Sequence, residues 1–283
     1  MITMRYFAPP LALRHHVSTY YWFESRLPAF ADLMRAELGQ IRLVVEGAAF
    51  SHYGDDHERL GRAAVLQGPT STPVHYRASG PLRFFGIGLL PRGWAELVDV
   101  PADEMADEMV DLAGVFPGNA VSTLLDRVAC ARDDAARVAA VNDALLERLA
   151  AARPCSSQWF TRLADDWLTA TTNPNVDWLV AQSGMSARSV ERLARRLYGA
   201  SPKLLARKYR ALGAAVRLGT GEAKSWADAA GDAFYDQAHF IREFRTFTGK
   251  TPARFLVETA PITRITLTRR RLVPGLPKLT MFA

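Results

Sequence analysis

Hydrophobic residues in the first 90 positions gather in short runs that are rich in β-branched and aromatic side chains. Turn-forming residues such as Gly54-Asp55-Asp56, Gly68-Pro69 and Gly80-Pro81 separate these runs. Several short strands with turns between them predict a small β-barrel or sandwich. The predicted strands cover residues 17–23, 41–45, 63–66, 74–77 and 82–89.

Helical spacing replaces this pattern in the residues that follow. Apolar side chains recur at intervals of three and four in two stripes, which predict two amphipathic helices. The stripes are Val121, Leu124, Leu125 and Val128, and then Val138, Val141, Leu145 and Leu149. The second stripe has two interpretations: it belongs to a helix packed inside its own domain, or it is the interface of a homodimer.

The second half of the chain is organised differently. Residues 152–157, Ala-Arg-Pro-Cys-Ser-Ser, are the best candidate for a linker, and from there to about Phe255 the pattern is helical throughout. We therefore expect an α+β fold, with a small β-barrel or cupin-like region and helices first and an all-α DNA-binding domain after it. The expected parts are a sensor or assembly domain at 1–152 with strands to about residue 90, a helical domain at 155–258, and a basic C-terminal tail at 259–283.

The strongest signal is an internal repeat at an offset of 50 residues, in which residues 186–202 correspond to residues 236–252. Charged and turn-forming residues recur at equivalent positions: Arg192 and Arg242, Arg195 and Arg245, Gly199 and Gly249, Ser201-Pro202 and Thr251-Pro252. The recurrence indicates two copies of one structural unit.

Each copy has the features of a capped amphipathic helix. Ser186 and Asp236 are good N-caps, because their side-chain oxygens accept hydrogen bonds from amides of the first helical turn. Gly199 and Gly249 can take the left-handed conformation that ends a helix. The apolar stripes are Val190, Leu193, Ala194 and Leu197 in the first copy, and Phe240, Phe244 and Phe247 in the second.

A short predicted helix precedes each copy. Residues 176–183 lead through Gly184-Met185 into the first, and residues 226–232 lead through Ala233-Phe234 into the second. A helix, a tight turn and a helix with a polar outer face form the helix-turn-helix pattern. Residues 202 to about 218 are predicted to form one helix that joins the two units.

With these features, residues 155–258 resemble the AraC/XylS family of bacterial transcription regulators. The resemblance is most specific over residues 234–252, Phe-Tyr-Asp-Gln-Ala-His-Phe-Ile-Arg-Glu-Phe-Arg-Thr-Phe-Thr-Gly-Lys-Thr-Pro. It implies a sequence-specific regulator that binds double-stranded DNA through two helix-turn-helix units joined by a long helix, with RNA polymerase as a further partner. One departure is Ala233, where the family usually has glycine, and it leaves the geometry of the second turn open.

The N-terminal half resembles the sensor regions of one branch of this family. The similarity lies in the aromatic strand Tyr20-Tyr21-Trp22-Phe23, in the strand that ends in Leu90-Pro91-Arg92-Gly93, and in the helices that follow. Such regions are often cupin-like barrels that bind an effector or a second protomer. The resemblance therefore implies that residues 1–152 sense a small-molecule effector, form a homodimer, or do both.

The outer faces of the two repeated helices supply the candidate DNA contacts. Arginine can form two hydrogen bonds with guanine, and glutamine can form two with adenine. The side chains expected to read bases are Arg188, Arg192, Gln237 and Arg242. Those expected to contact phosphates, because they lie further along the helices, are Arg195, Arg196 and Arg245. The candidate set also includes Ser186, Ser189 and Ala238.

Two further candidate residues, Glu191 and His239, each have two possible roles. Glu191 could accept a hydrogen bond from cytosine, or it could form an ion pair with Arg195 four residues later. His239 lies on the outward face of its helix and is either a DNA contact or simply exposed.

The distribution of charge supports a DNA-facing second half. Residues 1–154 carry 15 arginines, no lysine and 19 acidic residues, which gives a net charge of −4. Residues 155–258 carry +5, and residues 259–283 carry another +5. An acidic first half and a basic remainder indicate that only the remainder meets a polyanion.

Other classes of protein find less support. Cys130 and Cys155 are isolated thiols, which suits a reducing cytoplasm. No apolar stretch reaches the length of a membrane helix, and the first residues lack the pattern of a signal peptide, so we expect a cytoplasmic protein without a membrane partner. No catalytic constellation, cofactor motif or metal-ligand spacing is found, and we expect a protein that is not an enzyme. Two alternatives stay open: an enzyme whose cupin-like barrel does the chemistry, and an interaction module whose basic helices bind an acidic protein.

Overall fold

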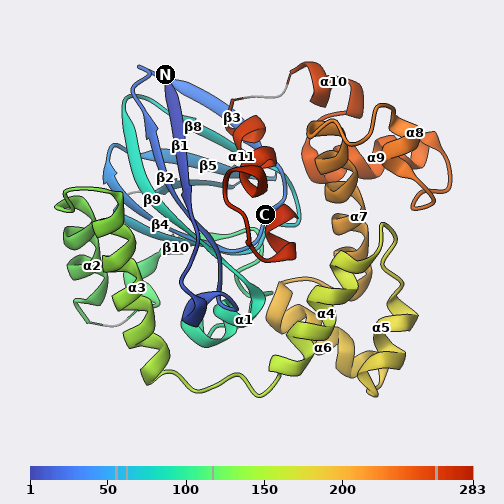
Figure 1. Ribbon diagram of the computed structural model, residues 1–283, viewed down its shortest axis with the longest axis horizontal. Coiled ribbons are helices and arrows are strands. Elements are labelled where there is room, and N and C mark those ends of the chain that lie inside the picture. Colours follow the sequence, from blue (N-terminus) through green and yellow to red (C-terminus); the bar gives the residue numbers. More distant parts are fainter. Residues whose placement is uncertain (55–56, 62, 117, 259–260, 283) are drawn as a thin grey trace.

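The computed structural model describes residues 1–54, 57–61, 63–116, 118–258 and 261–282. The N-terminal half consists of antiparallel sheets with helices against one face, and the remainder is helical (Figure 1). The predicted α+β fold, with strands first and an all-α region after them, is confirmed. In the described part of the chain, no helix has both the length and the apolar character needed to cross a bilayer.

The strands form two antiparallel sheets. One has the order β1-β2-β9-β4-β7-β10 and the other the order β3-β8-β5-β6. The bounds are β1 Ile2–Phe7, β2 Val17–Ser25, β3 Phe30–Met34, β4 Gln40–Glu46, β5 Ala49–Tyr53, β6 His57–Gly61, β7 Ala64–Gln67, β8 Val74–Ala78, β9 Leu82–Leu89 and β10 Met109–Asp111. The predicted strands correspond to β2, β4, β7, β8 and β9 and are confirmed, whereas the sequence pattern did not reveal the other five.

Short helical segments connect the strands. They are η1 (Leu11–Leu13), α1 (Pro91–Gly93), η2 (Trp94–Val98) and η3 (Leu112–Gly114). Both predicted helices of this half are present, as α2 (Ala120–Ala129) and α3 (Asp134–Ala151).

Strand β2 shows how the larger sheet is buried on both faces. Its side chains alternate, so that Tyr20 and Trp22 pack in a core shared with α2 and α3, while Tyr21 and Phe23 pack in a core shared with the smaller sheet. The Tyr20 hydroxyl donates a hydrogen bond of 2.8 Å to Asn142 Oδ1 on α3. The space between the two sheets is therefore lined largely by aromatic side chains.

The apolar stripe on α3 packs inside its own domain. Val141 and Leu145 are buried in the same core cluster as Tyr20, and Val138 and Leu149 pack against the edge of that cluster. The interpretation of this stripe as a dimer interface is wrong, because its side chains cover the sheet.

The helical part contains both predicted helix-turn-helix units. Its helices are α4 (Gln158–Ala170), α5 (Val176–Ser183), α6 (Ala187–Tyr198), α7 (Pro202–Gly219), α8 (Trp226–Ala230), α9 (Gln237–Thr248) and α10 (Pro252–Val257). Helices α5 and α6 form the first unit, α8 and α9 form the second, and α7 joins them (Figure 1).

The predicted caps of the two long second helices are present. Ser186 accepts a hydrogen bond from the amide of Ser189, and Asp236 accepts one of 2.7 Å from the amide of His239. Gly199 and Gly249 end these helices with φ angles of 78° and 77°, the left-handed region in which glycine pays no Cβ penalty.

The turn of the second unit differs from that of the first. Helix α5 is followed by Gly184 with φ of 65°, two residues before the N-cap of α6. Helix α8 ends at Ala230 rather than at Asp232, because Gly231 takes a φ of 53°. The second turn is therefore longer, and the side chain of Ala233 is buried within it.

The C-terminal segment folds back onto the N-terminal half. Helix α11 (Pro261–Leu272) packs on β1 and β3, and the short helix η4 (Lys278–Phe282) follows it (Figure 1). Asp32 Oδ2 accepts a hydrogen bond of 3.1 Å from the amide of Ile262, and the Thr280 hydroxyl donates one of 3.2 Å to the carbonyl of Ser18. The side chains at 269–271, which belong to the basic tail expected from the sequence, lie outside the described residues.

Candidate nucleic-acid interface

Helix α6 separates an apolar face from a basic one. Val190, Ala194 and Leu197 are buried in the core of the helical part, and Arg188 and Arg192 are exposed on the opposite side. At about 100° of rotation per residue, Arg192 lies roughly 200° from Val190, so its side chain points away from the core.

Helix α9 repeats this arrangement with aromatic residues. Phe240, Phe244 and Phe247 are completely buried, and the rings of Phe240 and Phe244 meet edge to face with centroids 5.5 Å apart. Arg242 and Arg245 are exposed on the other side of the helix. The two recognition-helix candidates thus present arginines at equivalent positions of the repeat.

The arginines at the shared position form no ion pair with any residue that the structure describes. Among the residues that the structure describes, no carboxylate oxygen lies within 4.0 Å of a guanidinium nitrogen of Arg192 or Arg242. The alternative role for such side chains, an ion pair that stabilises the domain, is therefore not seen at either position. Both guanidinium groups are available to an external anion.

Arg195 forms an ion pair with Glu191, which is one of the two interactions that the sequence predicts for Glu191. Its Nε and Nη2 donate to Glu191 Oε1 at 3.1 and 2.9 Å. Both side chains are half exposed, and exposed pairs with this spacing contribute only about 0.3–0.5 kcal/mol. A phosphate group could therefore compete for Arg195 at little cost.

The remaining polar candidates lie near the starts of the two helices. Gln237 and Ala238 are exposed in the first turn of α9, and the hydroxyl oxygens of Ser186 and Ser189 lie 3.0 Å apart at the start of α6. His239 is half-buried, its Nδ1 accepts a hydrogen bond of 3.3 Å from the amide of Tyr235, and its ring meets Phe234 edge to face. The imidazole of His239 thus supports the second turn.

Arg196 is exposed and lies beside the N-terminal half. It lines a groove between α6, the segment 99–101 and the linker, and its backbone carbonyl accepts a hydrogen bond of 2.8 Å from the amide of Ala102. A Cβ added at Gly199, just beyond, would lie 2.6 Å from Pro69 Cγ. The C-terminal end of α6 is therefore packed against the β-sheet domain.

The end of α9 is packed against the same domain. The carbonyl of Phe247 accepts a hydrogen bond of 2.9 Å from the amide of Ala36, and a Cβ added at Gly249 would lie 2.4 Å from Leu33 Cδ2. Sequence reasoning missed these contacts, because no local pattern marks a backbone amide between two strands as the partner of a distant helix.

Helix α7 contacts both the N-terminal half and helix α9. Lys208 is buried, and its Nζ donates to the carbonyls of Glu37 at 2.8 Å and Thr70 at 2.6 Å. Burial lowers the pKa of Lys208 to about 8. The preceding residue, Arg207, donates from Nε and Nη2 to the carboxylate of Glu243 on α9, each at 2.8 Å. The linking helix is thereby tied to the N-terminal domain and to the second recognition-helix candidate.

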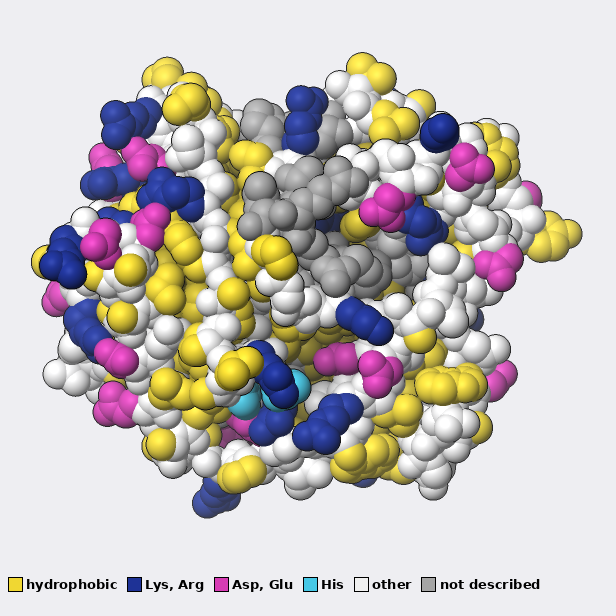
Figure 2. Space-filling view, in the orientation of Figure 1, with side chains coloured by type: hydrophobic (Ala, Val, Ile, Leu, Met, Phe, Trp, Pro, Cys, Tyr) yellow, Lys and Arg dark blue, Asp and Glu magenta, His cyan; other side chains and the backbone are white. Residues whose placement is uncertain are grey.

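The N-terminal half carries a surface of mixed charge. Many of its arginines are paired with acidic residues, for example Arg5 with Asp134 at 2.7 Å and Arg127 with Asp143 at 2.6 Å. Figure 2 shows basic and acidic side chains beside one another over the sheets and over α2 and α3. This arrangement agrees with the net negative charge of residues 1–154.

Comparisons with known proteins found two matching domain families. Residues 179–257 match a helix-turn-helix domain, and residues 5–111 match a domain of unknown function, DUF6597. No protein of curated function matches the chain.

Several solved structures are similar at low sequence identity. ToxT from Vibrio cholerae has a TM-score of 0.49 at 9% identity, over 90% of this chain and 98% of that one. The AraC-like transcriptional activator CuxR has a TM-score of 0.31 at 12% identity, over 69% of this chain and 80% of that one. A cupin superfamily protein from Desulfitobacterium hafniense has a TM-score of 0.25 at 14% identity, over 31% of this chain and 77% of that one.

Proposed function

Residues 179–257 form a helix-turn-helix domain of the AraC type, and from this premise we propose that the chain is a cytoplasmic, sequence-specific DNA-binding transcription regulator and not an enzyme. The observation that supports the proposal best is the pair Arg192 and Arg242. These two arginines occupy the same position of the repeat on two capped helices, and both are exposed and unpaired among the described residues.

In this proposal α6 and α9 enter successive segments of the major groove, about 10 bp apart on one face of the duplex. Arg188, Arg192, Gln237 and Arg242 read base edges, since each can offer two hydrogen bonds to a purine. Arg195 and Arg245 contact phosphates, which positions the helices without reading sequence. Control of RNA polymerase follows from binding near a promoter.

The N-terminal half is proposed to sense an effector and pass its state to the DNA-binding helices. Three consecutive residues between β3 and β4 support this role. Arg35 Nη1 donates to Thr266 Oγ1 on α11 at 2.7 Å, the Ala36 amide donates to Phe247 on α9, and the Glu37 carbonyl accepts from Lys208 on α7. A shift of residues 35–37 would therefore change the position of α9 relative to α7. A homodimer would be a further means of control, through a surface other than the stripe on α3.

The test is selection of duplexes from a random library by the full-length protein, followed by titration of the selected and scrambled duplexes. The selected duplex should bind at least about a thousandfold more tightly than the scrambled one. A double variant, R192A with R242A, should lose this preference, and R132A is a matched control because Arg132 is an exposed arginine between α2 and α3, outside both helices. Equal affinity of the wild-type protein for selected and scrambled duplexes would refute the proposal and favour an interaction module.

A further inference from the structure

The smaller sheet of the N-terminal half carries two histidines side by side. His52 on β5 and His75 on β8 are directly opposite each other in the antiparallel register of these strands. The sheet has the order β3-β8-β5-β6, so both histidines lie on its two central strands. No short spacing in the sequence marks this pair, because only folding brings the two strands together.

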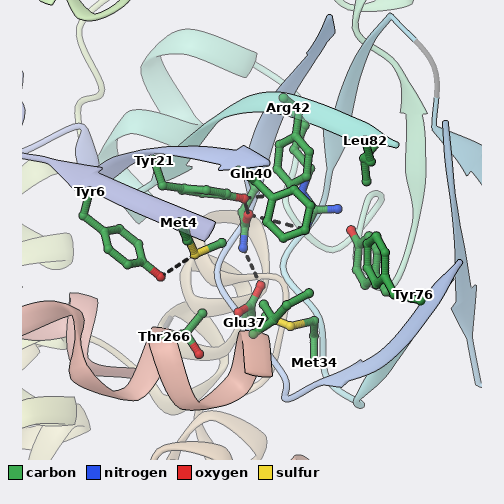
Figure 3. A pocket seen from close by; sticks show the side chains of 14 residues that line it. Met4, Tyr6, Tyr21, Met34, Glu37, Gln40, Arg42, Tyr76, Leu82 and Thr266 are labelled. Atoms are coloured by element: carbon green, nitrogen blue, oxygen red, sulfur yellow. Dashed lines mark hydrogen bonds between the residues drawn. The ribbon is translucent and has the colours of Figure 1, made fainter. Parts of the chain in front are cut away.

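Both histidines face away from the core of the domain. Their neighbours along the strands, among them Tyr53 and Tyr76, are buried in the core between the two sheets. Figure 3 shows Met34 and Tyr76 of the smaller sheet among the side chains that line this space. Because successive side chains of a strand point to opposite faces, His52 and His75 share the outer face, where the first is half-buried and the second exposed.

The two imidazoles have no partner within the described ranges of the chain. No hydrogen bond or ion pair joins either ring to a residue there. Two other histidines do have partners: His16 Nε2 lies 2.7 Å from Glu96 Oε2, and His239 Nδ1 accepts a hydrogen bond from the amide of Tyr235. A neutral imidazole keeps one ring nitrogen as an acceptor, so the rings of the pair can each offer a lone pair to a ligand from solution.

The spacing of the pair suits a single metal ion. Side chains directly opposite each other on antiparallel strands have Cβ atoms about 4.5–5.5 Å apart. Two imidazole nitrogens bound at about 2.0–2.1 Å to one tetrahedral ion lie about 3.3 Å apart, which small rotations of the two side chains can reach. Among the described residues, no set of three or more His, Cys, Asp or Glu side chains is placed to share an ion. The protein ligands are therefore two imidazoles, and water completes the coordination.

A carboxylate extends this row of side chains onto the next strand. Glu58 on β6 is directly opposite His52. It accepts hydrogen bonds of 2.7 to 2.9 Å from Arg77, which lies two residues after His75 on the same face of β8. Glu58 thus neutralises the one arginine that would repel a cation at the pair. A carboxylate beside a metal ligand can also accept a hydrogen bond from its ring N–H or from a bound water, which orients the ligand.

We propose that His52 and His75 together bind one divalent transition-metal ion of the kind that imidazole prefers, such as Zn²⁺, Ni²⁺ or Cu²⁺. The ion joins β5 to β8 on the outer face of the smaller sheet. Mg²⁺ is excluded by the same chemistry, because it prefers oxygen ligands.

The row of side chains ends at a contact with helix α9. Leu33 on β3 is directly opposite His75 and therefore lies on the same face. A Cβ added at Gly249, which ends α9, would lie 2.4 Å from Leu33 Cδ2 and 3.3 Å from Pro73 Cβ. An ion on the pair constrains β8 beside this contact, so its binding should change the affinity for DNA. That consequence rests on the function proposed above, whereas the metal site does not.

The test is calorimetric titration of the full-length protein, without a histidine tag, with NiCl₂, ZnCl₂ and MgCl₂. Ni²⁺ and Zn²⁺ should each bind at this site, and Mg²⁺ should not. H52Q and H75Q should each weaken the binding of both ions at least about tenfold. H15Q is the control, because His15 is an exposed histidine outside the sheet, and it should bind both ions like the wild type.

Circular dichroism checks that the variants fold, which is expected because both side chains lie on the surface of the sheet. A wild-type protein that binds neither Ni²⁺ nor Zn²⁺ would overturn the proposal. Binding that is unchanged in both H52Q and H75Q would place the ion elsewhere and overturn it as well.

DNA titrations with and without ZnCl₂ separate the metal site from the proposed function. A change in the affinity of the wild type for the selected duplex that is absent in H75Q supports the coupling to α9. An affinity that bound Zn²⁺ leaves unchanged refutes this coupling. Metal binding by a protein that never prefers the selected duplex supports the metal site and refutes the regulator.

Discussion

The amide of Ala36 donates a hydrogen bond of 2.9 Å to the carbonyl of Phe247, and so joins the segment between β3 and β4 to the last turn of α9. Phe247 is completely buried in a core cluster that also contains Ala36, Leu38 and residues of α7. The second recognition-helix candidate, α9, is therefore positioned by the N-terminal domain as well as by its own unit. The first is positioned in the same way, through Ala102 and the carbonyl of Arg196.

The two kinds of arginine on the recognition helices should behave differently on DNA. R192A and R242A should each cost about 1–3 kcal/mol on the selected duplex and much less on scrambled DNA, because a bidentate base contact is lost. Titrations of each variant on both duplexes measure the difference. Equal losses on both duplexes would contradict the assignment of these two residues as base readers.

Arg195 and Arg245 should act through phosphate. R195A and R245A should weaken selected and scrambled duplexes alike and should each reduce the slope of log K against log salt by about one unit. The measurement is a titration at two salt concentrations. A loss confined to the selected duplex would show that these arginines read bases instead.

Replacing the glycines that end the helices with alanine should lower the unfolding free energy by different amounts, which depend on the atoms around each glycine. G184A places a side chain at positive φ in open space and should cost about 1 kcal/mol of unfolding free energy. G199A and G249A carry the same strain and also push a Cβ against the N-terminal domain, so each should cost at least about 1 kcal/mol more. Urea unfolding of the three variants tests this order, and similar losses in all three would argue against tight packing at the interface.

Lys208 should make stability rise with pH. Burial lowers its pKa to about 8, below its unfolded value, so the unfolded chain binds more protons above that pH and the folded state gains stability as pH rises from 8 to about 10. The gain should be on the order of 1–3 kcal/mol. It should be absent in K208M and kept in K203M, where an exposed lysine of the same helix is removed. A similar pH dependence in K208M and the wild type would refute the role of this group.

Asp165 should make stability fall as pH rises. Burial raises its pKa to about 7, and its Oδ1 accepts a hydrogen bond of 2.7 Å from the Tyr198 hydroxyl at the end of α6. Its contribution is therefore present at pH 4 and is lost as pH rises through 7. D165N should be more stable than the wild type at pH 8, by about 1 kcal/mol, and similar to it at pH 5. Thermal unfolding at both pH values checks this, with D166N as the exposed neighbour for comparison.

Local features of the sequence were enough to determine the helical part. The caps Ser186 and Asp236 and the glycines Gly199 and Gly249 act within one helical turn, so their effect can be read from a few adjacent residues. The second turn is where this reasoning fell short. Its outcome depends on Gly231, which ends α8 two residues earlier than the apolar pattern predicts.

The strands were only partly predictable for a related reason. β2 and β9 carry continuous apolar runs, whereas β1 and β3 mix charged and apolar residues, and their strand conformation comes from pairing with β2 and β8. Likewise the stripe on α3 shows that a face is buried but not what covers it. That Leu145 packs on a sheet of its own chain is a tertiary fact.

What only the tertiary structure decided is which distant residues meet. The sequence placed Arg42 in a strand, but its burial beside Tyr76 and Gln40 depends on how two sheets face each other. Similarly, Lys208 meets the carbonyl of Glu37 across 171 positions of the chain. Caps and periodicity are set by neighbours within a helical turn, but burial, charge pairing and the contacts between the two halves depend on packing across the whole chain. For this reason the two helix-turn-helix units could be recognised from sequence, and the contacts between them and the N-terminal half could not.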